Sequence, residues 1–269
     1  MSLNFAAISP HPPIIVPEIG KGELSKVLPT VQAMKKLAAT FREAEIETLI
    51  VISPHMLIYP DQFSIAGMKK LFGTFASFGA PDLMMEFAND LELAEIIDKK
   101  ASAEGIKTLL YDNGGEFFEL DHGIMVPLSY LTFEQESTFK VIPIAFANLS
   151  RARHFSFGQI LGEVAKNYPG RVGIIASGDL SHRLNQGTKD EINAGQAFDQ
   201  KITGDLKENK IQDILYYDED FVEAAGECGY RSILILLGAL EAMNPKIKIL
   251  SYEGPFGVGY LVASYQLST

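Results

Sequence analysis

Short apolar runs rich in Val and Ile recur along this chain, separated by polar segments. Each run has the length of one strand and is bounded by Pro, Gly, Ser or Asp, a pattern typical of buried β-strands. The runs predict strands at Leu3–Ile8, Thr48–Ile52, Lys107–Tyr111, Lys140–Phe146, Val172–Ala176, Ile247–Ser251 and Val258–Tyr265.

Between these runs, apolar residues recur with the spacing of helices that cover a core. The predicted helices are Ser25–Glu45, Asp90–Glu104, Phe155–Asn167, Lys189–Glu208 and Tyr230–Met243. Strands that alternate with helices favour an α/β fold with a mostly parallel central sheet, flanked by helices on both faces. The chain has no Pro/Gly/Ser linker and no repeat, so residues 1–269 are expected to form a single domain. Phe72–Phe78 is predicted to pair with Phe63–Gly67 as an antiparallel excursion.

Length and composition exclude several classes of protein. With 269 residues, 47% of them hydrophobic, the chain can bury a large core. It lacks a run of the roughly 18 apolar residues that cross a bilayer, and it lacks the basic start of a secretory signal. We therefore expect a soluble, cytoplasmic protein with no membrane partner. A formal net charge of -11, with no basic cluster larger than a pair, makes nucleic acid an unexpected partner.

The single cysteine, Cys228, excludes an internal disulfide and a cysteine-rich zinc site. Histidines and carboxylates would then have to hold any metal, and such nitrogen and oxygen ligands indicate iron, manganese or zinc. Glu227 beside Cys228 is expected to raise the pKa of the thiol, and the sequence has no Gly-x-Ser-x-Gly motif. Nucleophilic catalysis is therefore not favoured.

Four of the five histidines lie in short polar segments next to predicted elements, whereas His154 does not. His11, His55 and His182 each follow a predicted strand. Because loops at the carboxyl ends of parallel strands form the ligand sites of open α/β sheets, the three imidazoles are expected to converge. Prolines beside His11 and His55 would restrict the backbone at these positions and so hold the two imidazoles in place. The alternative is that each is an ordinary loop or packing residue.

Three further features have two interpretations each. Asp121 and Asp179 could orient the neighbouring imidazoles, or they could cap helices. The stretch GPFGVG (254–259) precedes a strand rather than a helix, so it indicates a tight turn and not a phosphate cradle. The aromatic stretch Phe72–Phe78 is either core packing or the lining of an aromatic pocket.

Four motifs in order resemble those of the class III extradiol dioxygenases: SPHPP (9–13), SPH (53–55), LDHGIMVPL (120–128) and GDLSHRL (178–184). The similarity is greatest to the catalytic subunit of protocatechuate 4,5-dioxygenase, and it extends over nearly the whole chain. The same superfamily contains Memo-like proteins, including a group associated with AMMECR1. Asp-His-Gly followed by Val-Pro-Leu resembles the ring-cleaving enzymes, whereas Cys-Gly at 228–229 resembles the Memo-like proteins.

The resemblance implies a non-haem Fe(II) held by two histidines and one carboxylate, with open positions for a small aromatic substrate and O2. His11 and His55 match the ligand histidines. Glu227 is the preferred carboxylate and Glu253 its rival. His182 matches the catalytic base, and His122 matches the second active-site histidine. A second copy of the chain or a small companion subunit would be a possible partner.

Two other functions remain open from the sequence. The first is a Memo-like metal-binding or scaffold protein that lacks ring cleavage. The second is a Zn²⁺-dependent hydrolase with His182 as base, although the family resemblance disfavours hydrolysis.

Overall fold

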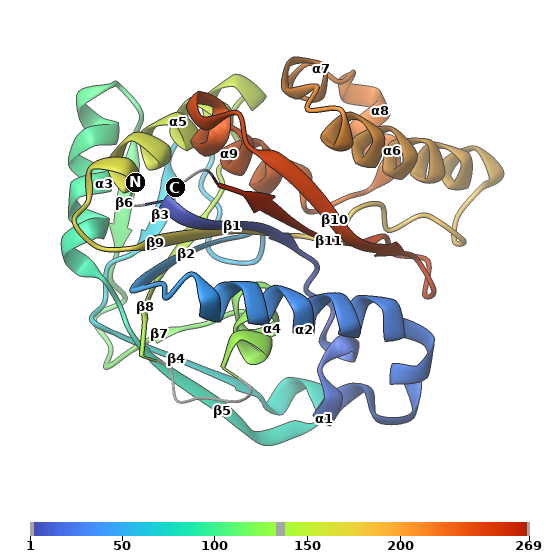
Figure 1. Ribbon diagram of the computed structural model, residues 1–269, viewed down its shortest axis with the longest axis horizontal. Coiled ribbons are helices and arrows are strands. Elements are labelled where there is room, and N and C mark those ends of the chain that lie inside the picture. Colours follow the sequence, from blue (N-terminus) through green and yellow to red (C-terminus); the bar gives the residue numbers. More distant parts are fainter. Residues whose placement is uncertain (1–2, 133–137, 268–269) are drawn as a thin grey trace.

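The computed structural model describes residues 3–132 and 138–267, and its centre is an eight-stranded sheet (Figure 1). The strand order is β10-β11-β1-β9-β2-β8-β3-β6. The strands are β1 (Leu3–Ser9), β2 (Thr48–Ser53), β3 (Phe63–Ala66), β6 (Thr108–Tyr111), β8 (Lys140–Ala145), β9 (Val172–Ser177), β10 (Lys246–Glu253) and β11 (Tyr260–Gln266). The run β1-β9-β2-β8 is parallel, as is the pair β3-β6, whereas β10, β11 and the β3–β8 pairing are antiparallel. The mostly parallel sheet predicted from the sequence is confirmed.

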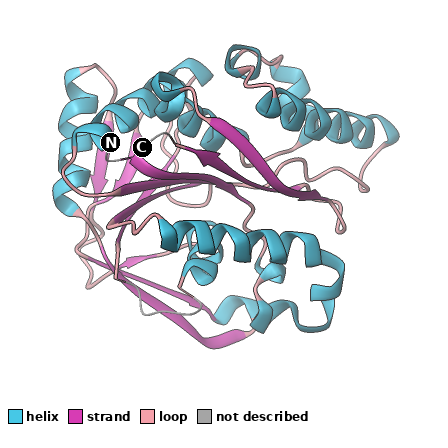
Figure 2. Cartoon of the chain, viewed as in Figure 1, coloured by secondary structure: helices cyan, strands magenta, loops and turns pink. Residues whose placement is uncertain are grey.

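Helices cover both faces of this sheet, as Figure 2 shows. Side chains alternate between the two faces of a strand, and in β2 Leu49 and Val51 pack in one core while Ile50 and Ile52 pack in the other. The first core includes α2 (Leu28–Glu43) and α4 (His122–Leu131). The second includes α3 (Leu91–Ala103), α5 (Arg151–Asn167), α6 (Lys189–Lys207) and α9 (Tyr230–Leu240). The α/β single-domain prediction therefore holds.

Short helices complete the helical part. They are α1 (Pro17–Gly20), α7 (Ile211–Leu215) and α8 (Glu219–Ala225), with 3-10 turns η1 (Pro13–Ile15), η2 (Lys21–Val27), η3 (Ala76–Phe78) and η4 (Glu241–Met243). The tightest helix contact is that of α5 with α9, where a Cβ on Gly158 would lie 1.9 Å from the carbonyl oxygen of Ile235. The glycine therefore lets the two backbones approach each other.

A second, three-stranded sheet has the order β5-β4-β7, from β4 (Lys70–Phe75), β5 (Ala80–Ala88) and β7 (Phe118–Glu119). The predicted pairing of Phe72–Phe78 with Phe63–Gly67 is wrong. Phe63 and Ile65 are completely buried, so β3 joins the large sheet instead. β4 pairs with β5 through a hairpin that turns at Gly79, whose φ of 79° is accessible to glycine.

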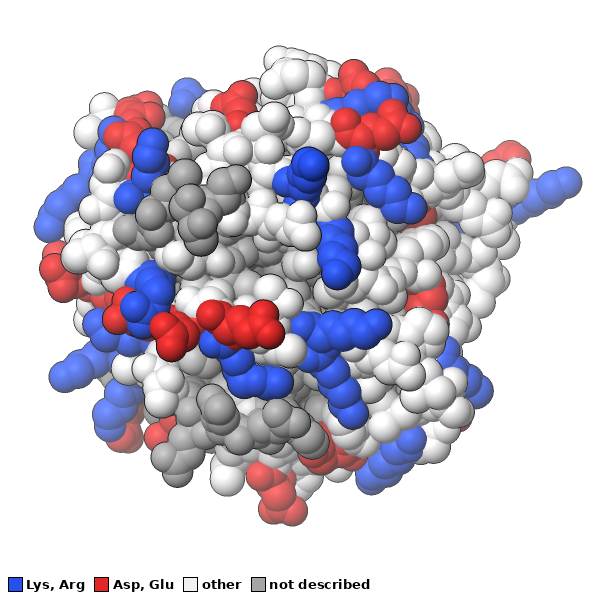
Figure 3. Space-filling view, viewed as in Figure 1, with Lys and Arg blue, Asp and Glu red and all other residues white. Residues whose placement is uncertain are grey.

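His154 lies inside α5 as a buried histidine whose two ring nitrogens both face backbone carbonyl oxygens. Nδ1 lies 2.9 Å from the carbonyl oxygen of Ser150, and Nε2 lies 3.0 Å from that of Ala147. This residue is part of the core. No helix among residues 3–132 and 138–267 is both long and apolar enough to cross a membrane. On the face shown in Figure 3, basic and acidic side chains are interspersed.

Candidate metal centre

His11, His55, His122 and His182 gather at one edge of the large sheet. His11 follows β1, His55 follows β2, and His182 lies beyond β9. Because β9 lies between β1 and β2 and all three are parallel, their carboxyl ends meet at this edge. The topology thus explains why segments far apart in the sequence share one site.

Three of the imidazole rings are in contact with one another. Nε2 of His55 lies 3.0 Å from Nε2 of His11. The ring of His122, at the start of α4, has its centroid 4.2 Å from that of His55 and 5.3 Å from that of His11. His11 is buried, whereas His55 and His182 are exposed. The imidazole of His11 is therefore shielded from solvent, whereas those of His55 and His182 are accessible to it.

Ser177 determines which nitrogen of His11 carries the proton. The Ser177 hydroxyl donates its single hydrogen to the carbonyl oxygen of Gly123, and it lies 3.0 Å from Nδ1 of His11. Since the hydroxyl has no second hydrogen, it accepts from Nδ1–H, and Nε2 keeps its lone pair. Burial lowers the pKa of His11 well below its usual value, and the charges of His55, His122 and His182 lower it further. His11 thus presents a neutral Nε2 to the cluster.

Asp121 acts as a helix cap, one of the two roles considered for it. Its side chain accepts from the backbone N–H of Ile124 at 3.2 Å and from the hydroxyl of Ser53 at 2.7 Å. The Ser53 hydroxyl in turn accepts the N–H of His55 at 3.2 Å. A Cβ on Gly123 would lie 2.4 Å from that hydroxyl oxygen. The start of α4 and the His55 loop are therefore fixed against each other.

The carboxylates of the two glutamates considered as metal ligands each accept a hydrogen bond from the first turn of a helix. The carboxylate of Glu227 accepts the N–H of Tyr230 at 2.5 Å, in the first turn of α9. That of Glu253 accepts the N–H of Thr30 at 2.8 Å, in the first turn of α2. Among the described residues, neither belongs to a group of three whose potential ligand atoms lie within 4.8 Å of one another.

Cys228 and Asp179 lie beside Nε2 of His11, although neither was expected as a ligand. The Cys228 sulfur lies 3.6 Å from Nε2 of His11, and Asp179 Oδ2 lies 3.9 Å from the same atom. The ligand atoms of His11, His55 and Cys228 all lie within 4.8 Å of one another, as do those of Asp179, His182 and Cys228. The sequence analysis did not place either residue among the ligands. The available signal was the Memo-like Cys-Gly pair at 228–229.

Asp179 and Cys228 hold each other in place. The Cys228 sulfur accepts the N–H of Asp179 at 3.2 Å, and the Asp179 carbonyl accepts the N–H of Gly229 at 2.9 Å. Oδ1 of Asp179 also accepts the N–H of His11 at 3.0 Å. This approach requires glycines, because a Cβ on Gly178 would lie 2.1 Å from Cα of Gly229.

The protonation of these groups provides a test of whether a metal fits. Burial raises the pKa of Asp179 to about 7. Burial also raises that of Cys228, with smaller contributions from the charges of Asp179 and Glu227, the latter expected from the sequence. A divalent cation would stabilise the carboxylate and the thiolate and would accept the two facing imidazole lone pairs. Two imidazoles, one thiol and one carboxylate around the same space thus fit a transition metal.

His122 and His182 are neutral groups at the rim of this space. Burial, followed by the charge of His55, lowers the pKa of His122 to about 4 and also lowers that of His182. The half-exposed ring of Phe78 lies 5.5 Å from that of His122, between centroids. Near neutral pH both imidazoles are therefore uncharged, and each has a nitrogen lone pair.

Comparison with protein families decides where this chain belongs. A model described as the catalytic LigB subunit of aromatic ring-opening dioxygenase matches residues 5–263. The chain belongs to the LigB family. LigB-family members are generally metal dependent, and the donor set described above is consistent with that property.

Three curated proteins are similar to this LigB-family chain. Protein CA_C1420 of Clostridium acetobutylicum is 36% identical over 266 residues, which are 97% of this chain and 57% of that protein. The 3,4-dihydroxyphenylacetate 2,3-dioxygenase of Escherichia coli is 23% identical over 224 residues, 78% of this chain and 79% of the enzyme. A MEMO1 family protein of Methanosarcina mazei is 25% identical over 206 residues, 77% and 66% of the two chains. The chain thus spans little more than half of the Clostridium protein.

The fold is also that of a known crystal structure. The uncharacterized protein JW3007 from Escherichia coli K12 superposes with a TM-score of 0.67 at 15% identity, over 97% of this chain and 99% of that one. This likeness supports the fold alone.

Proposed function

We propose that residues 1–269 form one catalytic-subunit-like domain that binds Fe(II) and opens the ring of a small aromatic diol or aminophenol with O2. The observation that carries this proposal is the convergence of four neutral imidazoles, one buried and the others around it. His11, His55 and Cys228 would hold the metal, with Asp179 beside them. This donor set differs from two histidines and a glutamate, because the Glu227 carboxylate accepts the N–H of Tyr230 in α9.

The bound metal would supply the redox chemistry that lets O2 react with an electron-rich ring. The chain's own residues would manage the protons. A phenol has a pKa of about 10, so binding of its anion near neutral pH requires a base. Exposed His182, neutral because its pKa is lowered, accepts that proton at an imidazole nitrogen. His122, also neutral, would hold a proton beside His55.

The overall reaction balances without an external reductant. One carbon–carbon bond of the ring breaks beside a hydroxyl-bearing carbon, and both atoms of O2 enter the product, an unsaturated semialdehyde acid. The ring supplies the electrons that reduce O2. The proton taken from the phenol by His182 returns to the product.

A second candidate, a Memo-like metal-binding protein without ring cleavage, is favoured by one observation. The thiol of Cys228, not a glutamate, lies beside His11. A thiolate is a softer ligand than a carboxylate and also suits copper and zinc. The chain's similarity to both a dioxygenase and a MEMO1 family protein is compatible with either candidate.

Oxygen uptake separates the two candidates. Protein reconstituted anaerobically with Fe(II) would be offered catechols and 2-aminophenols, with His11→Ala as the blank, while product absorbance and bound metal are followed. Uptake that requires His11 and yields a ring-opened product supports the dioxygenase. Stoichiometric metal without uptake across the panel contradicts ring cleavage and supports the second candidate.

A further inference from the structure

The backbone just before His182 is bound to two other parts of the fold. The N–H of Leu180 donates to the carbonyl oxygen of Gly259 at 2.8 Å, and the N–H of Gly259 donates back to the carbonyl oxygen of Ser181 at 2.8 Å. The hydroxyl of Ser181 donates to the carbonyl oxygen of Ala225 at 2.8 Å. The backbone is therefore fixed to the turn before β11 and to the end of α8.

A third anchor is Asp199, in the middle of α6. Its side chain is completely buried, and Oδ1 accepts the N–H of Ser181 at 2.8 Å. Oδ2 accepts the hydroxyl of Tyr252 in β10 at 2.8 Å. A hydrogen bond from a backbone N–H to a carboxylate is stronger than one between neutral groups. Asp199 thus joins the residue next to His182 to the centre of a 19-residue helix.

Gly259 leaves room for this carboxylate. A Cβ on Gly259 would lie 2.0 Å from Oδ2 of Asp199, so a side chain there would displace it. This glycine ends the stretch GPFGVG (254–259), for which the sequence predicted a tight turn. The carbonyl oxygen of Gly257 in the same stretch accepts the N–H of Leu184 at 3.0 Å. The turn therefore binds the backbone on both sides of the histidine.

The imidazole of His182 has no hydrogen bond of its own in the part of the chain that the structure describes. By contrast, the ring of His11 is held by Ser177, and that of His154 faces two backbone carbonyl oxygens. The place of the His182 ring is therefore set by its backbone. Because a displacement of about 1 Å can cost about 100-fold in rate, these backbone anchors affect how well His182 could act as a base.

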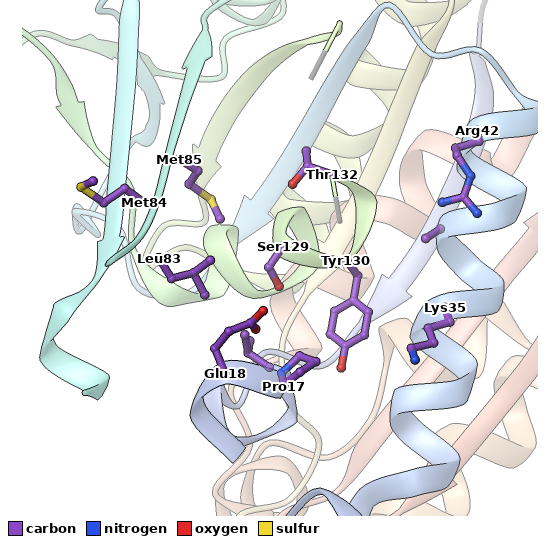
Figure 4. A pocket seen from close by; sticks show the side chains of 12 residues that line it. Pro17, Glu18, Lys35, Arg42, Leu83, Met84, Met85, Ser129, Tyr130 and Thr132 are labelled. Atoms are coloured by element: carbon purple, nitrogen blue, oxygen red, sulfur yellow. The ribbon is translucent and has the colours of Figure 1, made fainter. Parts of the chain in front are cut away.

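The surroundings of His182 relate this anchoring to the metal centre. A ring nitrogen of His182 lies within 4.8 Å of potential ligand atoms of Asp179 and Cys228. A cavity of about 480 Å³, shown in Figure 4, lies at the other end of α4 from His122, and residues 180–184 do not line it. The anchored segment therefore presents its imidazole to the metal centre and not to this cavity.

We propose that Asp199 is a positioning residue for His182. Through the N–H of Ser181, its carboxylate holds the backbone in the arrangement that places the imidazole at the metal centre. The inference rests on the proposed function, in which His182 is the base. It requires only an oxygen that accepts the N–H of Ser181, so an amide at the same position would serve.

The test compares Asp199→Ala, which removes the acceptor, with Asp199→Asn, which keeps an oxygen that can accept the N–H of Ser181. Asp205→Ala is the matched control, because Asp205 is also a buried carboxylate of α6 that accepts a tyrosine hydroxyl, that of Tyr217 at 2.6 Å. Oxygen uptake by the Fe(II)-reconstituted full chain, with the catechol that it turns over fastest, gives kcat and KM. Metal analysis and circular dichroism are measured on the same samples.

A second readout does not depend on turnover. The full chain without added metal is labelled with 13C-histidine, and the Cε1–H signals of its five imidazoles are recorded by NMR. His182→Gln identifies the signal of His182, and 13C relaxation of that signal reports the mobility of the ring. If the unmodified chain takes up no oxygen, this readout still decides whether Asp199 positions His182. Failure of the proposed function and failure of this inference are therefore distinguishable.

Asp199→Ala should lower kcat about tenfold or more, with KM within about threefold and metal content unchanged, and should increase the mobility of the His182 ring. Asp199→Asn should keep kcat within about threefold of the unmodified chain. Asp205→Ala should change neither kcat nor the His182 signal.

If Asp199→Ala does not fold, Asp199→Ser takes its place, because the serine hydroxyl is too short to reach the N–H of Ser181. The proposal is overturned if the His182 signal in the variant without the acceptor has the same shift and relaxation as in the unmodified chain. It is also overturned if Asp199→Asn lowers kcat as much as the variant without the acceptor.

Discussion

The sulfur of Cys228 lies 3.6 Å from Nε2 of His11, although the two residues are 217 positions apart in the chain. Ser177 fixes the His11 tautomer that presents its lone pair on this side. The neighbouring Glu227 is held at the first turn of α9. From this relationship we propose the thiol, and not the glutamate, as the third metal ligand.

Cys228→Ala and Glu227→Gln should therefore differ in their effect on metal binding. Loss of the thiol should weaken metal binding at least tenfold, because a ligand is removed, with little change in folding. Glu227→Gln should keep the metal and should not destabilise the protein at pH 8, because burial raises the pKa of Glu227 to about 7 and the amide oxygen of Gln can still accept the N–H of Tyr230. Chelator competition and thermal unfolding of both variants measure the two quantities. Metal loss in Glu227→Gln alone would restore the two-histidine, one-glutamate arrangement.

Ser177→Ala should weaken metal binding through His11. Without the hydroxyl, Nδ1 has no acceptor that fixes its proton, and loss of such a partner typically costs 10–100-fold in metal affinity. Ser232→Ala is the matched control, since that serine is also buried but its hydroxyl has no hydrogen-bond partner. Equal metal affinity of the two variants would contradict the role assigned to Ser177.

His182→Ala should reduce turnover by about 10²–10⁴-fold while the metal content stays unchanged, because a positioned base contributes that factor. Steady-state oxygen uptake and metal analysis on the same sample measure both. Turnover close to that of the unmodified chain would rule out His182 as the base.

Buried Asp199 gives the stability a defined pH dependence. Its carboxylate accepts the N–H of Ser181 at 2.8 Å and the hydroxyl of Tyr252 at 2.8 Å, yet burial raises its pKa to about 6. The folded state therefore binds a proton between about pH 6 and the ordinary Asp pKa of about 4, where the unfolded state does not. Consequently, the stability of the unmodified chain relative to Asp199→Asn should increase as pH falls from 7 to 4.5.

Denaturant unfolding of both proteins at several pH values checks this sign. The comparison cancels the titration of the buried histidines, which is common to both proteins. A difference that is constant with pH, or one that shrinks on acidification, would contradict the raised pKa of Asp199.

Two glycine substitutions should change stability in opposite directions. Gly158→Ala should destabilise the protein strongly, because its Cβ would lie 1.9 Å from the carbonyl oxygen of Ile235 and would push α5 from α9. Gly204→Ala in α6 should stabilise it by up to about 1 kcal/mol, because its Cβ meets no atom within 4 Å and alanine favours helices. Thermal unfolding of the two variants and of the unmodified chain measures both changes in stability. A Gly158→Ala variant as stable as the unmodified chain would contradict the close contact.

The sequence predicted the sheet well where a strand is buried on both faces. β2 and β9 are mostly apolar and are buried along their whole length, and their position in the sheet follows from the βαβ pattern. It failed at Phe63–Ala66, because a short apolar run does not reveal whether its partner is a nearby hairpin strand or the distant β8 and β6. Pairing between strands that are far apart in the sequence depends on which core their side chains fill.

The same limit applies to the site. His11, His55 and His182 could be assigned to one edge because each follows a parallel strand. That Cys228 lies beside His11 could not be predicted from the sequence, which offered Glu227 and Glu253 as the third ligand. It depends on how the backbone turns before α9, where Gly229 packs on Gly178 and Asp179 donates to the sulfur. These contacts are made between segments about 50 residues apart and have no local signature.

X-ray absorption at the iron edge of anaerobically reconstituted protein tests the central claim most directly. The account predicts one sulfur scatterer at about 2.3 Å, the distance typical of zinc thiolates, together with imidazole nitrogens, and it predicts that Cys228→Ser removes the sulfur signal. A first shell of nitrogen and oxygen alone in the unmodified protein would contradict the assignment of Cys228 as a ligand.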